Sequence, residues 1–322
     1  MKKALSVFLA LAILVLCLAS CGVNKNNESK LKIVVTIFPI YDWVKNILGD
    51  EIENTELTML LDSGADLHNY QATVEDIFKI SDCDLFIYVG GESDEWAEKA
   101  LQNGKNPNRV VINLMEELGD IIKEEEIVEG MEGEEGEEEE GEEPEYDEHI
   151  WLSLNNAVES VKIITEKLCS LNKEKQSAYK DNANTYSAKL SALDTEFKEN
   201  IKDKTINTVL FADRFPFRYM FDDYGIKYYA AFVGCSAETE ASFETIVFLS
   251  NKVDELNLKY IAVIDSSDSR IAQTVKNNTQ NKNQTIVKLD SLQSTTKYDV
   301  ENGKTYYDTM KQNLEILSQI LH

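Results

Sequence analysis

Two of the three histidines in this 322-residue chain occur where a metal ion could bind. His68 and His149 stand in polar segments flanked by acidic residues rather than on an apolar face, whereas His322 is the last residue. A neutral imidazole is a common ligand of Zn²⁺ and of other first-row ions. Because a ligating imidazole must be neutral, binding at these histidines should weaken in acid.

Aspartates that follow predicted strands supply a second type of ligand. In open α/β sheets, ligands bind beyond the carboxyl ends of the strands. Four polar candidates follow predicted strands in this way: His68, Asp213, Asp265 and Asp290. Imidazole and carboxylate together favour Zn²⁺, with Mn²⁺ and other first-row ions as alternatives. We therefore expect a cation site in a cleft between two domains, with one half of the chain supplying imidazoles and the other carboxylates.

Each candidate also has an ordinary structural interpretation. A single loop histidine is usually a surface residue, and an aspartate such as Asp290 after a strand is more often a turn residue or a helix cap. The sequence contains no HExxH motif, no Ser-His-Asp motif and no phosphate-binding loop. Spacing alone therefore leaves metal binding as one interpretation among several.

An acidic loop, residues 123–148, leads into His149. It holds sixteen of the 58 aspartates and glutamates in the chain. Such a run cannot bury apolar surface, so we expect it to be solvated and without regular structure. Most charge runs have no further role, but dense carboxylates on a flexible segment beside an imidazole can also collect divalent cations.

Strands and helices alternate in the first half of the chain, which is typical of a parallel α/β domain. The spacing predicts strands at 31–38, 55–61, 84–89 and 109–113, and helices at 40–48, 74–80 and 94–101. The loop that carries His68 begins where the second strand ends. His68 is therefore expected at the carboxyl edge of the sheet.

A long helical region almost free of helix breakers, residues 155–201, separates this half from a second alternating half. There the pattern predicts strands at 207–211, 228–232, 260–264 and 285–289, and a closing helix at 305–321. We predict two α/β lobes, each with a central, mostly parallel sheet, joined by one long rigid connector helix. The predicted boundaries are an N-terminal lobe at 31–170, the connector at 171–203 and a C-terminal lobe at 204–322.

The first thirty residues predict an extracytoplasmic location. A positively charged start precedes a short apolar stretch that is too short for a membrane-spanning helix. Residues 18–21 (LASC) resemble the bacterial lipobox, in which a signal peptidase cuts before the cysteine and its thiol carries lipid. We expect a lipoprotein signal peptide at 1–20, a tether at 21–30 and a membrane anchor on Cys21. The alternative is an ordinary signal peptide that is cut at small residues.

Composition argues against two classes of protein. The net charge of −26 argues against a nucleic-acid partner, because binding a polyanion needs a basic patch. The remaining cysteines of the mature chain, Cys83, Cys169 and Cys235, are widely spaced and form no CxxC pair. Neither a disulfide framework nor a thiolate zinc finger is therefore expected.

Several segments together resemble the zinc-binding lipoproteins that serve as extracytoplasmic solute receptors for metal ABC transporters. Residues 64–70 (GADLHNY) resemble that family's Gly-x-Asp-Pro-His-x-Tyr loop, and residues 147–152 (DEHIWL) resemble its Asp-Pro-His-x-Trp segment. Residues 81–90 (SDCDLFIYVG) match a characteristic strand, and 289–292 (LDSL) match the strand-end aspartate. The resemblance covers essentially the whole mature chain and implies that His68, His149 and Asp290 are ligands.

The sequence departs from the family pattern at the third ligand. Alignment on Tyr224 and Gly225 puts Arg214 where zinc members have histidine and manganese relatives have glutamate. A guanidinium is permanently cationic and cannot ligate a metal. Asp213 could take over, a neighbour such as Cys235 or Glu238 could reach in, or water could fill the position. Arg214 could instead fix a carboxylate ligand from outside the centre.

The resemblance implies a receptor and not an enzyme, one that binds Zn²⁺ in an interdomain cleft and delivers it to an ABC permease with its ATPase. It further implies a monomer anchored at the cell membrane. The first alternative is the same fold with manganese or iron as cargo. A lipid-anchored metallohydrolase would need an open metal position and a base. In a surface adhesin, the third alternative, the metal site would be incidental.

Overall fold

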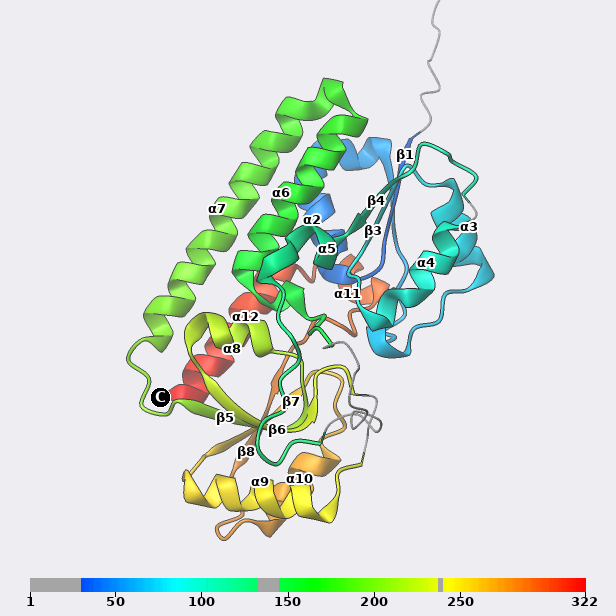
Figure 1. The fold of residues 1–322 in the computed structure, drawn as a ribbon. Coiled ribbons are helices and arrows are strands. Elements are labelled where there is room, and N and C mark those ends of the chain that lie inside the picture. Colours follow the sequence, from blue (N-terminus) through cyan, green and yellow to red (C-terminus); the bar gives the residue numbers. More distant parts are fainter. Residues whose placement is uncertain (1–29, 103, 133–144, 237–239) are drawn as a thin grey trace, which may run out of the picture. The chain divides into compact units, whose positions relative to one another are not determined.

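The N-terminal lobe is built on a four-stranded sheet in the order β2–β1–β3–β4, with all neighbouring strands parallel (Figure 1). The computed structural model describes residues 30–102, 104–132, 145–236 and 240–322. The strands are β1 (Leu31–Val35), β2 (Thr55–Met59), β3 (Leu85–Tyr88) and β4 (Val110–Asn113). Every residue of β3 is buried, as expected for a central parallel strand that is covered on both faces.

The helices of this lobe begin at local sequence signals. α2 (Phe38–Leu48) has Pro39 in its first turn, where a missing backbone N–H costs no hydrogen bond. α3 (Val74–Asp82) starts at a capping box made by Thr73 and Asp76. Two shorter helices complete the alternation, α4 (Glu95–Leu101) and α5 (Leu114–Leu118).

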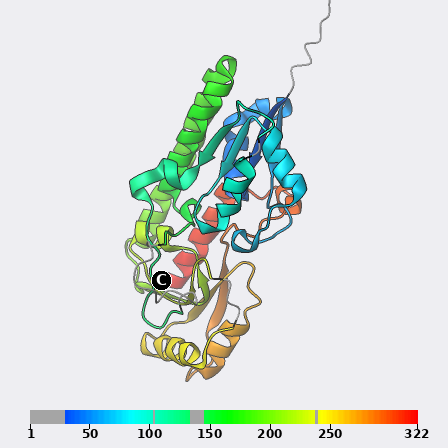
Figure 2. The same ribbon diagram turned by 45° about the vertical axis from the view of Figure 1, so that its right-hand side comes forward.

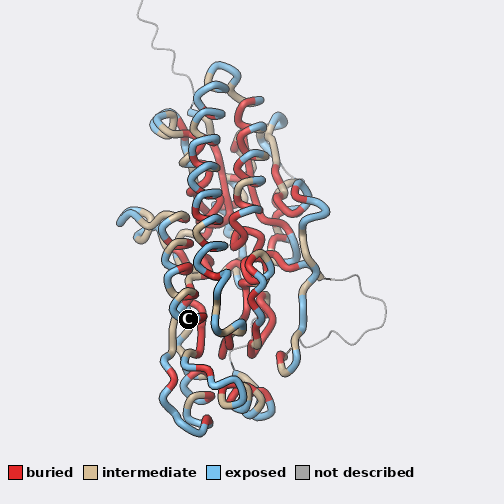
Figure 3. The backbone as a smooth tube through the Cα atoms, turned by 90° about the vertical axis from the view of Figure 1, so that its left-hand side faces the viewer, coloured by how far each residue is buried: buried red, intermediate tan, exposed pale blue. Residues whose placement is uncertain are grey.

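Two long helices, α6 (Leu154–Leu171) and α7 (Gln176–Ile201), lie side by side on one flank of the molecule (Figure 1). The helical run breaks at Asn172, whose φ of −132° and ψ of 85° are not helical, so α6 and α7 are two separate helices. One face of α7 packs inward and is buried along the helix, while the opposite face is exposed (Figure 3). The prediction of a long helix joining two α/β lobes is confirmed.

The C-terminal lobe repeats the parallel architecture in the strand order β6–β5–β7–β8. Its strands are β5 (Thr208–Phe215), β6 (Lys227–Val233), β7 (Tyr260–Ile264) and β8 (Thr285–Leu289). Its helices are α8 (Arg218–Tyr224), α9 (Phe243–Glu255), α10 (Arg270–Asn278), α11 (Lys297–Glu301) and α12 (Tyr306–Leu321). The expectation that Asp213 follows the first of these strands is wrong, because β5 continues to Phe215 after a register irregularity beyond Phe211.

The closing helix α12 packs against both lobes and against the connector (Figure 2). Its first residue, Tyr306, lies edge-on to Trp43 of α2 with the ring centroids 5.4 Å apart. The buried carboxylate of Asp42 accepts hydrogen bonds from the Tyr186 hydroxyl at 3.1 Å and from the Tyr306 backbone at 3.3 Å. Helices α2, α7 and α12 therefore meet at one buried polar junction.

Residues 31–322 form one compact unit. None of the helices in the described ranges combines the length and the apolar character needed to cross a membrane. The predicted signal peptide, the predicted lipidation site Cys21 and Glu238 lie outside the described residues. The lobe boundaries given above stay predictions.

Candidate metal centre

The two histidines sit on short 3₁₀ turns that their own sequences stabilise. His68 lies in the turn Leu67–Asn69, after β2, and its backbone N–H donates to the Asp66 carboxylate at 3.1 Å. His149 immediately precedes the turn Ile150–Leu152, and its backbone N–H donates to the Asp147 carboxylate at 2.8 Å. In both segments an aspartate two residues before the histidine fixes the backbone that carries the ring.

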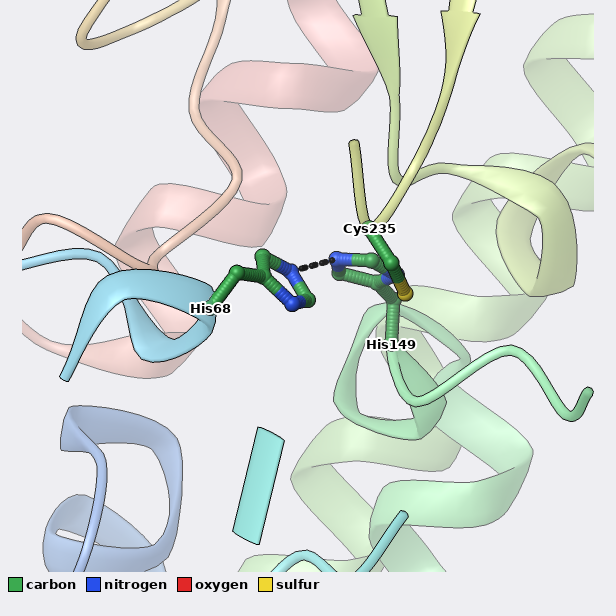
Figure 4. Close-up of side chains that lie close together, drawn as sticks. All are labelled: His68, His149 and Cys235. Carbon is green, nitrogen blue, oxygen red and sulfur yellow. Dashed lines mark hydrogen bonds between the residues drawn. The ribbon is translucent and has the colours of Figure 1, made fainter. Parts of the chain in front are cut away.

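The two imidazoles face one another across the interior of the molecule (Figure 4). Their Nε2 atoms lie 3.1 Å apart and their ring centroids 5.1 Å apart. His149 is completely buried, and the His68 side chain is only 4% exposed. The sequence prediction that these histidines converge is therefore met by the geometry.

The outward-facing nitrogen of each ring is held by oxygen atoms. His149 Nδ1 lies 2.9 Å from the Asp147 carboxylate, which also accepts the backbone hydrogen bond described above. His68 Nδ1 lies 2.7 Å from the Ser93 hydroxyl and 3.6 Å from the Glu148 carboxylate. With a proton on each Nδ1, the Nε2 lone pairs of the two rings would point toward a common point, which is how ligating histidines are oriented in metal sites.

Burial and neighbouring charges shift the pKa values of the two imidazoles in opposite directions. Burial, followed by the charge of His149, lowers the pKa of His68 to about 3. Burial also opposes a charge on His149, but the Asp147 carboxylate together with the charges of Glu148 and Glu125 outweighs burial and raises the pKa of His149. His68 is therefore neutral over the physiological range, as a metal ligand must be.

A third side chain at this point, Gln293, escaped the sequence analysis. It is buried, and its amide nitrogen lies 2.9 Å from His68 Nε2 and 2.8 Å from His149 Nε2. The oxygen and nitrogen of an amide are assigned from their hydrogen bonds, and a half turn about the last bond exchanges them. Gln293 can therefore offer its oxygen to a cation held by the two histidines. The available signal was its place three residues after Asp290, in the same strand-end segment.

Cys235 places a sulfur atom beside the His149 ring (Figure 4). It lies in the turn after β6, and its Sγ and one ring nitrogen each of His68 and His149 all lie within 4.8 Å of one another. Burial, followed by the negative charges of Glu148, Glu125 and Asp147, raises the pKa of the Cys235 thiol well above its usual range. Among the described residues, the side chains of His68, His149 and Cys235 form a group that could hold a metal ion.

A cavity of about 280 Å³ adjoins this cluster. Both His68 and Cys235 contribute to its wall, together with Ser93 and four glutamates: Glu92, Glu125, Glu145 and Glu148. Glu148 is almost completely buried, and burial raises the pKa of its carboxyl to about 7. The approach to the imidazoles is therefore lined by carboxyl groups, which favour a cation over an anion.

Arg214 lies outside the centre and joins two of the loops that build it. Its guanidinium donates to the Asp66 carboxylate at 2.5 Å and to the backbone carbonyl of Ser236 at 3.1 Å. Asp66 caps the turn of His68, and Ser236 follows Cys235 in the chain. Arg214 thus positions the loops of His68 and Cys235 relative to each other.

The structure does not bring the two predicted aspartates into the cluster. Asp213 lies within β5, and its carboxylate accepts the Arg214 backbone N–H at 2.9 Å. Asp290 turns back toward its own loop, where it accepts from the Leu292 backbone at 2.8 Å and pairs with Lys304 at 2.7 Å. Metal ligation by Asp213 or Asp290 stays a prediction, and it would require each carboxylate to leave these partners.

Asp265, the other strand-end candidate, is likewise engaged. It accepts hydrogen bonds from both the backbone and the hydroxyl of Ser291, each at 2.9 Å. The Ser291 backbone carbonyl in turn accepts a hydrogen bond from the indole N–H of Trp151 at 2.9 Å. Trp151 lies two residues after His149 in the chain. Asp265 therefore helps to place the segment that carries Gln293 against the segment that carries His149.

Replacing Arg214 with methionine should destabilise the fold. The Arg214 and Asp66 side chains are only 12% and 13% exposed, and breaking a buried pair by removing one partner typically costs about 3 kcal/mol or more. Urea denaturation of the variant should show a free energy of unfolding that is lower by about this amount. The control is Arg270→Met, because Arg270 pairs with Asp268 on the surface with its side chain 75% exposed. That change should cost less than about 0.5 kcal/mol. Equal losses in both variants would contradict a positioning role for Arg214.

Comparison with known proteins places this geometry in context. The profile of the family described as zinc-uptake complex component A, periplasmic (ZnuA) matches residues 33–320. The zinc-binding lipoprotein AdcA of Streptococcus pneumoniae is 30% identical over 327 residues, which cover 99% of this chain and 61% of that protein. The chain thus spans less than two thirds of that relative's length.

Two further relatives match over nearly their whole length. The high-affinity zinc uptake system protein ZnuA of Bacillus subtilis is 29% identical, with 100% of this chain and 99% of that protein covered. The crystal structure of the Zn(II)-bound ZnuA-like domain of Streptococcus pneumoniae AdcA superposes with a TM-score of 0.71 at 26% identity. That superposition covers 91% of this chain and 99% of the domain.

Proposed function

Because the chain belongs to the family of periplasmic zinc-uptake components, we propose that it is an extracytoplasmic receptor that binds Zn²⁺ between its two lobes. In this proposal it delivers the ion to the permease of an ABC transporter, which its ATPase drives. The observation that carries the proposal is the pair of buried imidazoles whose Nε2 atoms lie 3.1 Å apart while both Nδ1 atoms are held from outside.

The donor atoms suit zinc as cargo. Zn²⁺ takes four ligands in tetrahedral sites and accepts imidazole nitrogen, thiolate sulfur and oxygen. His68 and His149 supply two nitrogens, and Gln293 can supply an amide oxygen after a half turn of its terminal group. Hard ions such as Mn²⁺ and Mg²⁺ favour carboxylate, carbonyl and water oxygens, which this cluster offers sparingly.

The anchor and the partners belong to the proposal as well. Lipid on Cys21 would hold the receptor at the outer surface of the cell membrane, where it would meet the permease as a monomer. The acidic loop 123–148 would collect cations beside the entrance to the site. Support for this role comes from the carboxyl groups of Glu125 and Glu145, which lie on the described parts of the loop and line the cavity next to His68.

Growth and uptake under zinc limitation test this function. We expect deletion of the gene to slow growth in chelated medium and to reduce uptake of radioactive zinc. Full-length protein and a His322→Ala variant should restore both, since His322 is exposed at the end of the chain. A variant with both His68→Ala and His149→Ala should restore neither.

Other outcomes would point to the alternatives. Rescue by manganese or iron but not by zinc would leave the receptor role and change the cargo. Normal growth of the deletion strain together with lost adhesion would support an adhesin. A hydrolase screen of the purified protein with and without zinc would detect a metal-dependent enzyme.

A further inference from the structure

We propose that Cys235 supplies a thiolate ligand to the bound cation, so that the site combines two imidazoles with one sulfur and selects thiophilic ions over hard ones. This inference rests on the receptor function proposed above and specifies the class of its cargo. It concerns one residue that the resemblance did not assign as a ligand.

The distances fit a single ion. With Zn–N distances of about 2.0–2.1 Å and a Zn–S distance of about 2.3 Å, tetrahedral ligand atoms lie roughly 3.3–3.6 Å from one another. The two Nε2 atoms are 3.1 Å apart, and the Cys235 Sγ lies within 4.8 Å of one ring nitrogen of each histidine. For the sulfur to bond the same ion as the two imidazoles, the Cys235 side chain must close the remaining distance as the ion binds.

The backbone beside Cys235 is shaped for close approach to the histidines. A Cβ atom at Gly234 would lie 2.9 Å from His149 Cε1 and 3.0 Å from the Phe215 carbonyl oxygen, so a larger residue would push the turn away. On the other side, Arg214 holds the Ser236 carbonyl at 3.1 Å. The residues before and after Cys235 thus both fix its place at the centre.

Arg214, which stands where the resemblance places a third ligand, does not compete with the Cys235 sulfur for the ion. Its guanidinium is committed to Asp66 and Ser236, and it carries no lone pair for a metal. The remaining donors that converge are two imidazole nitrogens, the Cys235 sulfur and the amide of Gln293. That set makes four ligands, the usual number for zinc.

Binding exchanges a proton for the metal. The carboxyl group of Glu125 lines the same cavity as Cys235 and can take up the proton of the thiol. As the cation arrives, the S–H bond breaks, its electron pair forms the sulfur–metal bond, and the proton passes to Glu125 and then to solvent. The thiolate neutralises one of the two charges of a divalent ion, and the neighbouring carboxylate of Asp147 offsets the other.

The softness of a metal ion decides how much affinity it gains from a thiolate ligand. Thiolate sulfur binds borderline and soft ions such as Zn²⁺, Co²⁺ and Cu⁺ strongly, whereas Mn²⁺ and Mg²⁺ gain little from it. A site with two imidazoles and an amide alone would discriminate less between zinc and manganese. Cys235 would therefore be the residue that sets the preference for zinc.

Cobalt spectroscopy tests the sulfur bond directly. The protein for this test begins at Gly22 and contains the whole compact unit 31–322, so Cys235 is accompanied only by Cys83 and Cys169. We expect the wild type to bind about one Co²⁺ per chain and to show an intense thiolate-to-cobalt band in the near ultraviolet. Cys235→Ser should lose the band, whereas Cys169→Ser, a change at a free cysteine that is buried elsewhere, should keep it.

A second measurement covers the case in which Cys235→Ser does not fold. A double variant, Cys83→Ser with Cys169→Ser, leaves Cys235 alone, and its band would assign the thiolate to Cys235. Competition between Zn²⁺ and Mn²⁺ completes the test: Cys235→Ser should reduce the preference for zinc at least about tenfold. An unchanged preference would overturn the proposal.

The outcomes separate this inference from the function on which it rests. One Co²⁺ per chain with no thiolate band in the wild type would overturn the sulfur ligand and leave a receptor that binds through its histidines. A band that survives in Cys235→Ser would overturn it as well. Absence of Co²⁺ and Zn²⁺ binding in the wild type would overturn both proposals.

Discussion

Replacing His149 with alanine should weaken zinc binding by two to three orders of magnitude. Protein zinc sites bind with roughly 10–16 kcal/mol shared among three or four ligands, so each ligand is worth about 3–4 kcal/mol. His149 is completely buried, and its Nε2 lies 3.1 Å from the His68 Nε2, so alanine removes one of the two facing nitrogens. The dissociation constant should be measured by competition with a chromophoric chelator, and His68→Ala should show a loss of similar size.

The control for both variants is His322→Ala, since that histidine is exposed and far along the chain from the centre. Its zinc affinity should equal that of the wild type. Far-ultraviolet circular dichroism should accompany the titrations, because alanine at a buried position also leaves a cavity. Wild-type affinity in folded His68→Ala and His149→Ala variants would show that these imidazoles do not hold the ion.

The second large effect is expected at Asp147, which does not contact the ion. Its carboxylate accepts two hydrogen bonds from His149, one from the backbone at 2.8 Å and one from Nδ1 at 2.9 Å. Asparagine keeps the size of the side chain but removes the negative charge that orients the ring and strengthens its basicity. Outer partners of ligating histidines typically contribute 10–100-fold in metal affinity, so Asp147→Asn should weaken zinc binding by about this factor.

A surface aspartate provides the matched control for this change. Asp50 is exposed at the end of α2, and Asp50→Asn alters the net charge by the same amount. Its zinc affinity should stay within about twofold of the wild type. If both variants weakened binding equally, the effect would come from long-range charge, and Asp147 would have no positioning role.

The lobes and the two histidine turns could be predicted because local signals specify them. Alternating strands and helices fix a parallel sheet in each half, and Pro39 and Thr73 mark the helix starts. The aspartates two residues before His68 and His149 stabilise the turns in which the histidines occur. All of these are interactions between residues close in the chain.

The rest of the site depends on contacts between distant segments, which spacing does not reveal. Arg214 pairs with Asp66, 148 positions away, and Gln293 reaches histidines 144 and 225 positions away. Asp290 matches the expected strand-end position, but Lys304 neutralises it, and the chain continues for three residues before a side chain reaches the imidazoles. A single sequence could not show which of these two polar residues faces the centre.

Asp213 shows why the end of β5 could not be predicted from the sequence. The polar residues Asp213 and Arg214 suggested that the strand had stopped at Phe211, yet pairing with β6 resumes at Arg214 and Phe215 after an irregularity. The irregular step lets Arg214 reach Asp66 and the Ser236 carbonyl. Here tertiary contacts outweigh the local preference of charged residues for loops.

The central claim, that the buried histidine pair holds a zinc ion, is tested most directly by the metal content of the purified protein. The chain from Gly22 onward should be isolated gently, without chelators, and analysed by mass spectrometry beside its His68→Ala and His149→Ala variants. We expect about one zinc per wild-type chain and almost none in either variant. Metal that is absent from the wild type, or retained in both variants, would contradict the claim.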